Sequence, residues 1–251
     1  MSRLIPPLSI AALTGLVVAH AQAADPGLDI ELEAGATWQA KNRVQIPNDS
    51  QGTRFSLTDL AGSGPWGTAR LNLRWDINEQ HGLRVVLAPF SYSERGRLDR
   101  DVDFSGQRYT ADEAVKGSYR FNSWRVGYRY TAVERDNWRL WVGGTLKVRD
   151  AQIKLQQGAT TGRDANVGVV PLLYLAAEYR LSPQWLLRAD FDGLAGGPGR
   201  AFDVSLKATY ELDDHWRVGI GYRGLEGGVD NDDVYNFAWF NTALASVTYR
   251  F

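Results

Sequence analysis

Apolar and polar residues alternate with a period of two along most of this chain. From Trp138 to Arg149, the even positions are Trp, Leu, Val, Gly, Leu and Val, whereas the odd positions include Arg, Thr and Lys. This alternation is typical of β-strands with one apolar and one polar face. It predicts strands at residues 28–46, 66–77, 83–93, 117–130, 138–150, 166–180, 185–193, 201–212, 216–223 and 236–251.

The connections between these segments alternate between short and long. Such alternation, with segments of about 10 residues or more, predicts an all-β, antiparallel up-and-down transmembrane β-barrel of about 10 strands, with short turns on the periplasmic side. Counts of 8 or 12 strands stay open, because 54–60 and 102–109 could add strands. The short connections are 78–82, 131–137, 181–184 and 213–215, and the long ones are 47–65, 94–116, 151–165, 194–200 and 224–235.

Aromatic residues bracket three of the short connections, with a Tyr before the turn and a Trp after it. The chain holds 9 Trp and 11 Tyr. Barrels in membranes place such amphipathic rings in girdles at the interfaces. We therefore expect an interface girdle formed by Tyr130, Trp138, Tyr179, Trp185, Tyr210 and Trp216.

Both ends of the chain carry signals for export or assembly. Arg3 and the apolar run 8–18 precede Ala-Gln-Ala at 21–23, which is the pattern of a cleavable secretory signal peptide. At the other end, Tyr249 and Phe251 lie on one strand face, and the chain ends on the aromatic residue. With the alternating strands, these features resemble Gram-negative outer-membrane β-barrel proteins, including small barrels with an aromatic C-terminal assembly signature.

This resemblance implies the organisation and location of the protein. Residues 1–23 would be a cleaved signal peptide, and residues 24–251 would form a single barrel domain in the outer membrane of a Gram-negative bacterium. The implied partners are outer-membrane lipid, lipopolysaccharide and the barrel-assembly machinery, which would recognise the last strand through Tyr249 and Phe251. The stretch from Gly221 to Trp239 looks like a motif of such barrels, but no activity attaches to it.

Charged residues lie on the strand face opposite to the apolar one. Arg or Lys facing lipid at the midplane costs about 2–4 kcal/mol, so these residues are expected to line the interior and to form ion pairs there. We also expect Glu31 and Glu33 on the first strand to meet Arg250 on the last. The predicted lumen-facing charges are Arg70, Arg74, Arg84, Arg125, Arg129, Lys147, Glu178, Arg188, Asp190, Asp192, Asp203, Lys207, Arg217 and Arg223.

Three details depart from regular strands. Pro89 and Pro171 lie inside strand patterns, and since proline removes a ladder donor, we expect a bulge or a position at the rim at each. The alternation also changes phase between Phe121 and Trp124, which predicts a bulge.

Composition excludes several kinds of chemistry. The chain has no cysteine, so it can form neither a disulfide nor a thiolate metal site. Without the signal, 27 basic and 29 acidic residues remain, a balance that argues against nucleic acid as a partner. We predict no cofactor. The acids Glu226, Asp230, Asp232 and Asp233 share a long loop, but their spacing matches no closed calcium loop, so no metal site is predicted.

The distribution of histidine argues against catalysis. His20 leaves with the signal, whereas His81 and His215 lie in short turns, away from the outer loops. No Ser-His or Asp-His site can therefore form at the outer end. We expect a non-enzymatic outer-membrane barrel with an Arg-rich lumen, either closed by salt bridges or open as a narrow passage. The alternatives are an outer-membrane enzyme acting on lipid or peptide, and a soluble periplasmic barrel that binds a small apolar ligand.

Overall fold

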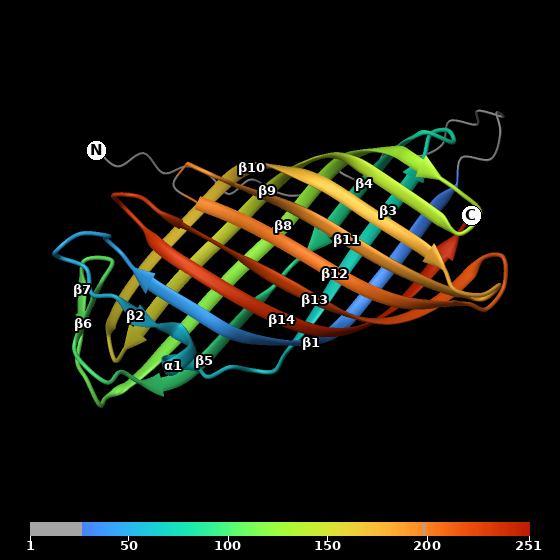
Figure 1. The fold of residues 1–251 in the computed structure, drawn as a ribbon. Helices are drawn as coiled ribbons and strands as arrows, with labels where there is room; N and C mark the ends of the chain where they lie inside the picture. Colours follow the sequence, from blue (N-terminus) through green and yellow to red (C-terminus); the bar gives the residue numbers. More distant parts are fainter. Residues whose placement is uncertain (1–26, 198) are drawn as a thin grey trace, which may run out of the picture.

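The computed structural model describes residues 27–197 and 199–251, and it is a closed antiparallel β-barrel (Figure 1). Twelve strands are hydrogen-bonded in one sheet, which closes where β14 pairs with β1. Because β2 only flanks β1, and β4 and β5 pair successive parts of β8, the wall has 10 strand positions. The predicted count of 10 is confirmed. The signal peptide predicted at 1–23 lies outside the described residues.

The wall strands follow one another around the barrel in chain order, as the alternating pattern predicts. None of the described helices is long and apolar enough to cross a membrane. The wall consists of β1 (Leu28–Gln45), β3 (Trp66–Asp76), β4 (His81–Ala88), β5 (Ser91–Arg97), β8 (Ala114–Glu134), β9 (Trp138–Gln157), β10 (Thr160–Arg180), β11 (Trp185–Gly196), β12 (Gly199–Glu211), β13 (Trp216–Asp230) and β14 (Tyr235–Arg250).

The long connections contain more regular structure than the sequence predicts. Residues 151–165 were expected to be a loop, but they continue β9 and β10 as a paired hairpin with only Gly158 and Ala159 between the strands. The predicted loops at 194–200 and 224–235 are likewise largely strand. The remaining long connections contain β2 (Phe55–Ser56), the helix α1 (Leu57–Ala61) and the hairpin of β6 (Val102–Phe104) and β7 (Gln107–Tyr109).

The hydrophobic face of the strands changes sides along the barrel. In the half near the short turns, outward side chains such as Val126 on β8 and Leu146 on β9 are apolar and 59% exposed, whereas inward Arg125 and Lys147 are buried. Nearer the outer end, the inward side chains are apolar, as at Tyr119, and the outward ones are polar. This is the pattern expected of a barrel that leaves lipid for water, because the apolar face turns away from whichever surroundings are polar.

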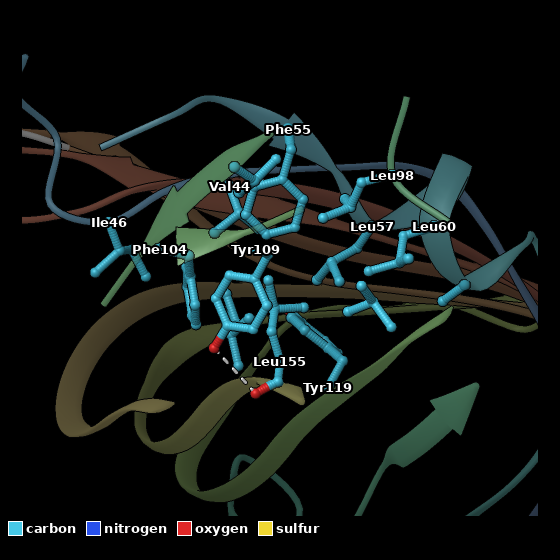
Figure 2. Close-up of a cluster of buried hydrophobic side chains, with 14 of the residues drawn as sticks. Val44, Ile46, Phe55, Leu57, Leu60, Leu98, Phe104, Tyr109, Tyr119 and Leu155 are labelled. Atoms are coloured by element: carbon cyan, nitrogen blue, oxygen red, sulfur yellow. Dashed lines mark hydrogen bonds between the residues drawn. The ribbon is translucent and has the colours of Figure 1, made fainter. Parts of the chain in front are cut away.

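Side chains from the outer loops and the inner wall form an apolar cap over the outer end (Figure 2). Helix α1 begins at Ser56, whose hydroxyl accepts the Asp59 N–H at 3.1 Å, and it ends at Gly62 with a φ of 75°. The Tyr109 hydroxyl donates to the Leu155 carbonyl at 3.2 Å. The buried residues of the cap are Val44, Ile46, Phe55, Leu57, Leu60, Ala61, Tyr92, Leu98, Val102, Phe104, Tyr109, Val115, Tyr119, Ile153, Leu155, Ala238 and Phe240.

The cap explains why the bulge predicted between Phe121 and Trp124 is wrong. The β8–β9 register runs without a shift through these residues, and the described shift on β8 falls between Thr131 and Val133. Phe121 points inward, on the same face as Arg125. Phe121 is apolar because the barrel interior changes from charged to apolar at this height. The side chains of β8 therefore keep alternating between the two faces without a bulge.

The two prolines have different settings. Pro89 lies between β4 and β5, so it interrupts one wall position. Pro171 lies within β10, where the β9–β10 register is unbroken, so a bulge at Pro171 is wrong. The β10–β11 ladder begins only at Leu173, and Pro171 therefore lies beyond its end. A residue without an N–H is tolerated there because that strand edge has no ladder to complete.

A substitution at Leu146 tests which part of the barrel wall faces lipid. We expect Leu146→Arg to lower the free energy of unfolding in lipid bilayers by about 2–4 kcal/mol, because the guanidinium would be held near the midplane. Gln152→Arg, on the same face of β9 but in the polar outer zone, should change it little. Urea titrations in bilayers measure both, and equal effects would contradict the assignment of the apolar zone to lipid.

Candidate functional site: the charged lumen

Asp203 on β12 is the centre of the ion-pair network in the lumen. It is 4% exposed, and its carboxylate accepts hydrogen bonds from Arg70, Arg125 and Arg223 at 3.0, 2.6 and 2.7 Å. These arginines belong to β3, β8 and β13, so one carboxylate joins strands from different sides of the barrel. Charge-assisted hydrogen bonds of this kind are roughly twice as strong as neutral ones, and arginine holds them in a fixed geometry.

A second node lies at Asp192 on β11, which is also 4% exposed. Arg125 binds it at 2.7 Å with the nitrogen that Asp203 leaves free, so this one guanidinium bridges both carboxylates. Arg84 also pairs with Asp192, and the Thr145 hydroxyl donates to it at 2.7 Å. The guanidinium of Arg84 lies 3.8 Å from the centre of the Tyr174 ring, which adds a cation–π contact.

A third node joins the first strand to the opposite wall. Lys207 Nζ lies 2.6 Å from Glu31 and 2.9 Å from Glu33. Arg74 completes the pairing of Glu31 at 2.6 Å, and Arg223 that of Glu33 at 2.8 Å. Arg223 thus connects this node with Asp203.

Apart from Lys147, which forms no ion pair among the described residues, the remaining predicted lumen charges pair nearer the short turns. Arg188 binds Asp190 at 2.9 Å and Glu178 at 3.5 Å, and the Tyr174 hydroxyl donates to Asp190 at 2.8 Å. Further pairs are Arg129 with Asp76 and Arg217 with Glu211.

The ion pair at the barrel closure differs from the prediction. Arg250 does not meet Glu31 or Glu33, because its guanidinium binds Asp29 at 2.8 and 3.0 Å. Asp29 and Arg250 are direct cross-strand partners in the β1–β14 register, whereas Glu31 and Glu33 lie opposite Thr248 and Ser246. A register cannot be read from one strand alone, so the sequence identified the right strands but the wrong carboxylates.

Little space remains among these charges. The cavity within the network has a volume of about 20 Å³ and is lined by residues of all three nodes. A second cavity of about 60 Å³ lies between Arg125 and the aromatic rings Phe90 and Phe240. A single water needs about 10–15 Å³ on this kind of measure, so the network leaves room for isolated waters rather than for a solute.

The predicted girdle residues pair across neighbouring strands. Trp138 lies 4.6 Å from Tyr179, and Trp185 lies 5.2 Å from Tyr210, between ring centres. Trp216 meets Tyr249 at 4.8 Å, and Tyr249 meets Phe251 at 4.6 Å. Tyr130 contacts the His81 ring at 5.5 Å. The Phe251 N–H donates to the Leu28 carbonyl at 3.0 Å, which places the predicted assembly residues beside the start of β1.

The polar residues outside the lumen satisfy local needs. In the short turn before β13, the N–H groups of Trp216 and His215 hydrogen-bond the Asp213 carboxylate and lower its pKa. Among the acids of the last long connection, Glu226 pairs with Arg200 at 2.8 Å and Asp230 accepts from Asn48 at 2.9 Å. Within residues 27–197 and 199–251, no cluster of three potential ligand side chains forms a metal site.

Comparison with solved structures places this fold among outer-membrane barrels. The outer membrane protease OmpT from Escherichia coli matches with a TM-score of 0.55 at 10% identity, over 92% of this chain and 99% of that one. AlkL matches with a TM-score of 0.42 at 12% identity over 95% and 97%, and Ail of Yersinia pestis with 0.38 at 11% over 91% and 100%. No family model matches the chain. No curated protein matches its sequence.

Sequence reasoning missed two features of the interior. One is Tyr174, which is fully buried and connects Asp190 with Arg84 and Arg188. Because side chains alternate between the two faces of a strand, Tyr174 falls on the inward face of β10. Its neighbours along the strand are apolar, however, so the sequence pattern did not single it out from the residues that face lipid. The other is the apolar cap, which combines inward residues of predicted strands with residues of predicted loops, such as Phe55, Leu98 and Leu155.

Proposed function

We propose that this protein is a non-enzymatic, integral outer-membrane barrel whose lumen is closed to solutes and whose wall supports a folded outer end. The observation that carries this proposal is Arg125, which is 2% exposed and bridges Asp192 and Asp203 across the lumen. An aqueous pore needs free space along its axis, whereas this interior is filled by paired side chains, as expected for barrels with few strands.

The wall supports the second half of the proposal. Strands β8, β9 and β10 have 21, 20 and 21 residues. A tilted strand needs only about 9–11 residues to cross the hydrocarbon region. The remainder of each strand extends beyond the apolar zone of the wall, and there inward side chains of β8 and β9, such as Val115 and Leu155, pack in the cap. The barrel would therefore display a rigid structured surface outside the membrane.

The proposed location and partners follow from the outer surface. Exposed apolar side chains surround the half of the barrel near the short turns. Examples are Leu32, Leu206 and Ile220, which are 50, 57 and 67% exposed. In water they would form a large unprotected patch, which argues against a soluble periplasmic barrel. We place the protein in the outer membrane of a Gram-negative bacterium, in contact with lipid and lipopolysaccharide. Tyr249 and Phe251 on the final strand would engage the barrel-assembly machinery.

A conductance measurement tests the closed lumen. We expect the folded protein in planar bilayers to give no discrete conductance steps, because the ion-pair network fills the cross-section. Heat modifiability on a gel should show that the sample is folded, and a 16-stranded porin in the same bilayer should serve as the positive control. Reproducible steps from folded protein would refute the closed lumen and support a narrow passage.

An enzymatic role receives less support from the site. OmpT is described as a protease, but the likeness at 10% identity concerns the fold. Both histidines among the described residues, His81 and His215, lie at the short-turn end. Carboxylates in the outer half, such as Asp150 and Glu226, pair with arginines. Overexpression should leave lipid A and added peptides unchanged, and a modified lipid or cleaved peptide would restore the enzyme alternative.

A further inference from the structure

The outer half of the wall has an opening between β10 and β11. The two strands pair only from Leu173 and Gly193 toward the short turns. Beyond that point β10 continues to Thr160 paired with β9, and β11 continues to Gly196 paired with β12. The β9–β10 and β11–β12 hairpins therefore separate, and Pro171 lies on the open edge of β10.

A cavity of about 470 Å³ lies inside this opening. Its lining is mainly apolar and includes Val169 and Pro171 from one edge of the opening and Leu194 and Ala201 from the other side. Val169 is 66% exposed on the outer surface of the wall, so the cavity extends from the outside of the barrel toward its interior. Its volume lies within the range of about 300–1,000 Å³ that is common for small-molecule sites.

The inner end of the cavity carries a buried cation without a carboxylate partner. Lys147 on β9 is 2% exposed, and among the described residues no carboxylate oxygen lies within 4.0 Å of its ammonium group. Its cross-strand neighbours are Arg125 and Val170. Arg125 is a cation that already pairs with Asp192 and Asp203, and the Phe121 ring lies 4.7 Å from the Lys147 Nζ as a cation–π contact.

A second cation lines the same cavity. Arg149 lies one inward position further out on β9. Its buried Nε has no hydrogen-bond partner within the described chain, and its guanidinium donates elsewhere only to the neutral Asn166 amide. A further cation of the lining, Arg200, is already paired with Glu226 at 2.8 Å. Burying a charge is costly unless a counter-charge and hydrogen bonds compensate it. Two under-compensated cations next to an apolar space thus provide a binding environment for an anionic headgroup with an aliphatic chain.

We propose that the cavity binds a single-chain anionic amphiphile, which enters from the outer leaflet between β10 and β11. The headgroup, a carboxylate or a phosphate, would pair with Lys147 and Arg149. The chain would extend past Val169, Pro171 and Leu194 toward the opening. This inference rests on the proposed placement in a membrane, but it does not depend on whether the lumen conducts.

Photo-crosslinking in phosphatidylcholine nanodiscs tests this site with a diazirine-bearing dodecanoate as the probe. The probe should label residues of β9, β10 and β11 that line the cavity. Unlabelled dodecanoate and dodecyl phosphate should compete, and their relative potency would distinguish a fatty-acid source from a phospholipid source. Dodecanol and dodecylphosphocholine, which carry no net negative charge, should compete at least about 10-fold less well, as expected from loss of a charge-assisted contact.

Matched variants separate the two parts of the site. Lys147→Met, which keeps the length of the side chain, should weaken probe binding about 10-fold or more, and Lys147→Arg should restore most of it. Lys116→Met, at an exposed position on β8, should leave binding unchanged. Leu194→Trp should block binding by filling the cavity while Lys147 remains. It therefore tests the site even where Lys147→Met disturbs folding.

The outcomes distinguish this inference from the proposed function. Equal binding by Lys147→Met and the parent protein, or equal competition by dodecanol, would refute the anionic site. If probe binding does not depend on Lys147 and the protein also gives no conductance steps, the anionic site is refuted and the closed-lumen proposal stands. Conductance steps together with saturable, Lys147-dependent binding would instead refute only the closed lumen.

Discussion

Replacing Asp203 by Ala should lower the free energy of unfolding by about 3–5 kcal/mol, the range for a buried ion pair that loses one partner. The substitution removes the carboxylate that Arg70, Arg125 and Arg223 share. Among the described residues, Arg125 would keep Asp192 and Arg223 would keep Glu33. Arg70 would keep its hydrogen bond to the neutral Asn72 amide at 3.1 Å, but its one remaining carboxylate would be Glu33, at 4.0 Å. Three guanidinium groups would then repel one another in a space that admits little water. Urea titration in detergent or bilayers measures the change.

Two further variants make this prediction specific. Asp203→Asn retains an acceptor oxygen but loses the charge, so it should fall between Ala and the parent. Asp103→Ala removes an exposed partner of Arg108, itself 65% exposed, and should change stability by only about 0–1 kcal/mol. Equal effects of Asp203→Ala and Asp103→Ala would show that the network contributes no more than surface charges do.

Replacing Phe104 by Ala should destabilise the apolar cap by about 3–5 kcal/mol while leaving the lower barrel folded. Phe104 is fully buried and meets the Phe55 ring edge-on at 5.8 Å. Truncation would leave a void between the β6–β7 hairpin and the segment of β2 and α1. Because these segments join the wall through few backbone ladders, we expect local opening before global unfolding.

Hydrogen exchange measured by mass spectrometry resolves this local effect. Amides at 53–61 and 102–109 should exchange faster in Phe104→Ala, whereas those of β11 to β13 should keep their protection. Phe104→Leu retains most of the apolar volume and should cost less than about 1.5 kcal/mol. Faster exchange throughout the wall would mean that the cap and the barrel unfold as one cooperative unit.

The contrast between Arg125 and Tyr119 shows how far the sequence could be interpreted. Both lie on the inward face of β8, but one belongs to the charged lumen and the other to the cap. A rule that polar faces point inward is valid only while lipid surrounds the wall. Beyond the lipid-facing zone, toward the outer end, the rule reverses and inward side chains are apolar. For this reason Ile153 and Leu155 were assigned to a loop, although they continue the inward face of β9.

Lys147 shows a second limit. The alternation on β9 places its side chain inward, among cations that the sequence predicts will pair. Only the register of β8, β9 and β10 shows that its neighbours are Arg125 and Val170, and only the end of the β10–β11 ladder shows that an apolar cavity lies beside it. Neither fact is contained in the order of residues along one strand.

The sequence by itself predicted about 10 wall strands, with 8 or 12 left open, their antiparallel order, their inward face in the half near the short turns, and the short turns with their aromatic residues. These properties follow from local alternation and turn length, which act over a few residues. Tertiary structure alone decided that Arg250 meets Asp29, that Asp203 gathers three arginines, that the outer loops fold into a cap, and that β10 and β11 separate. Each of these depends on register and on packing between distant segments, which no local pattern specifies.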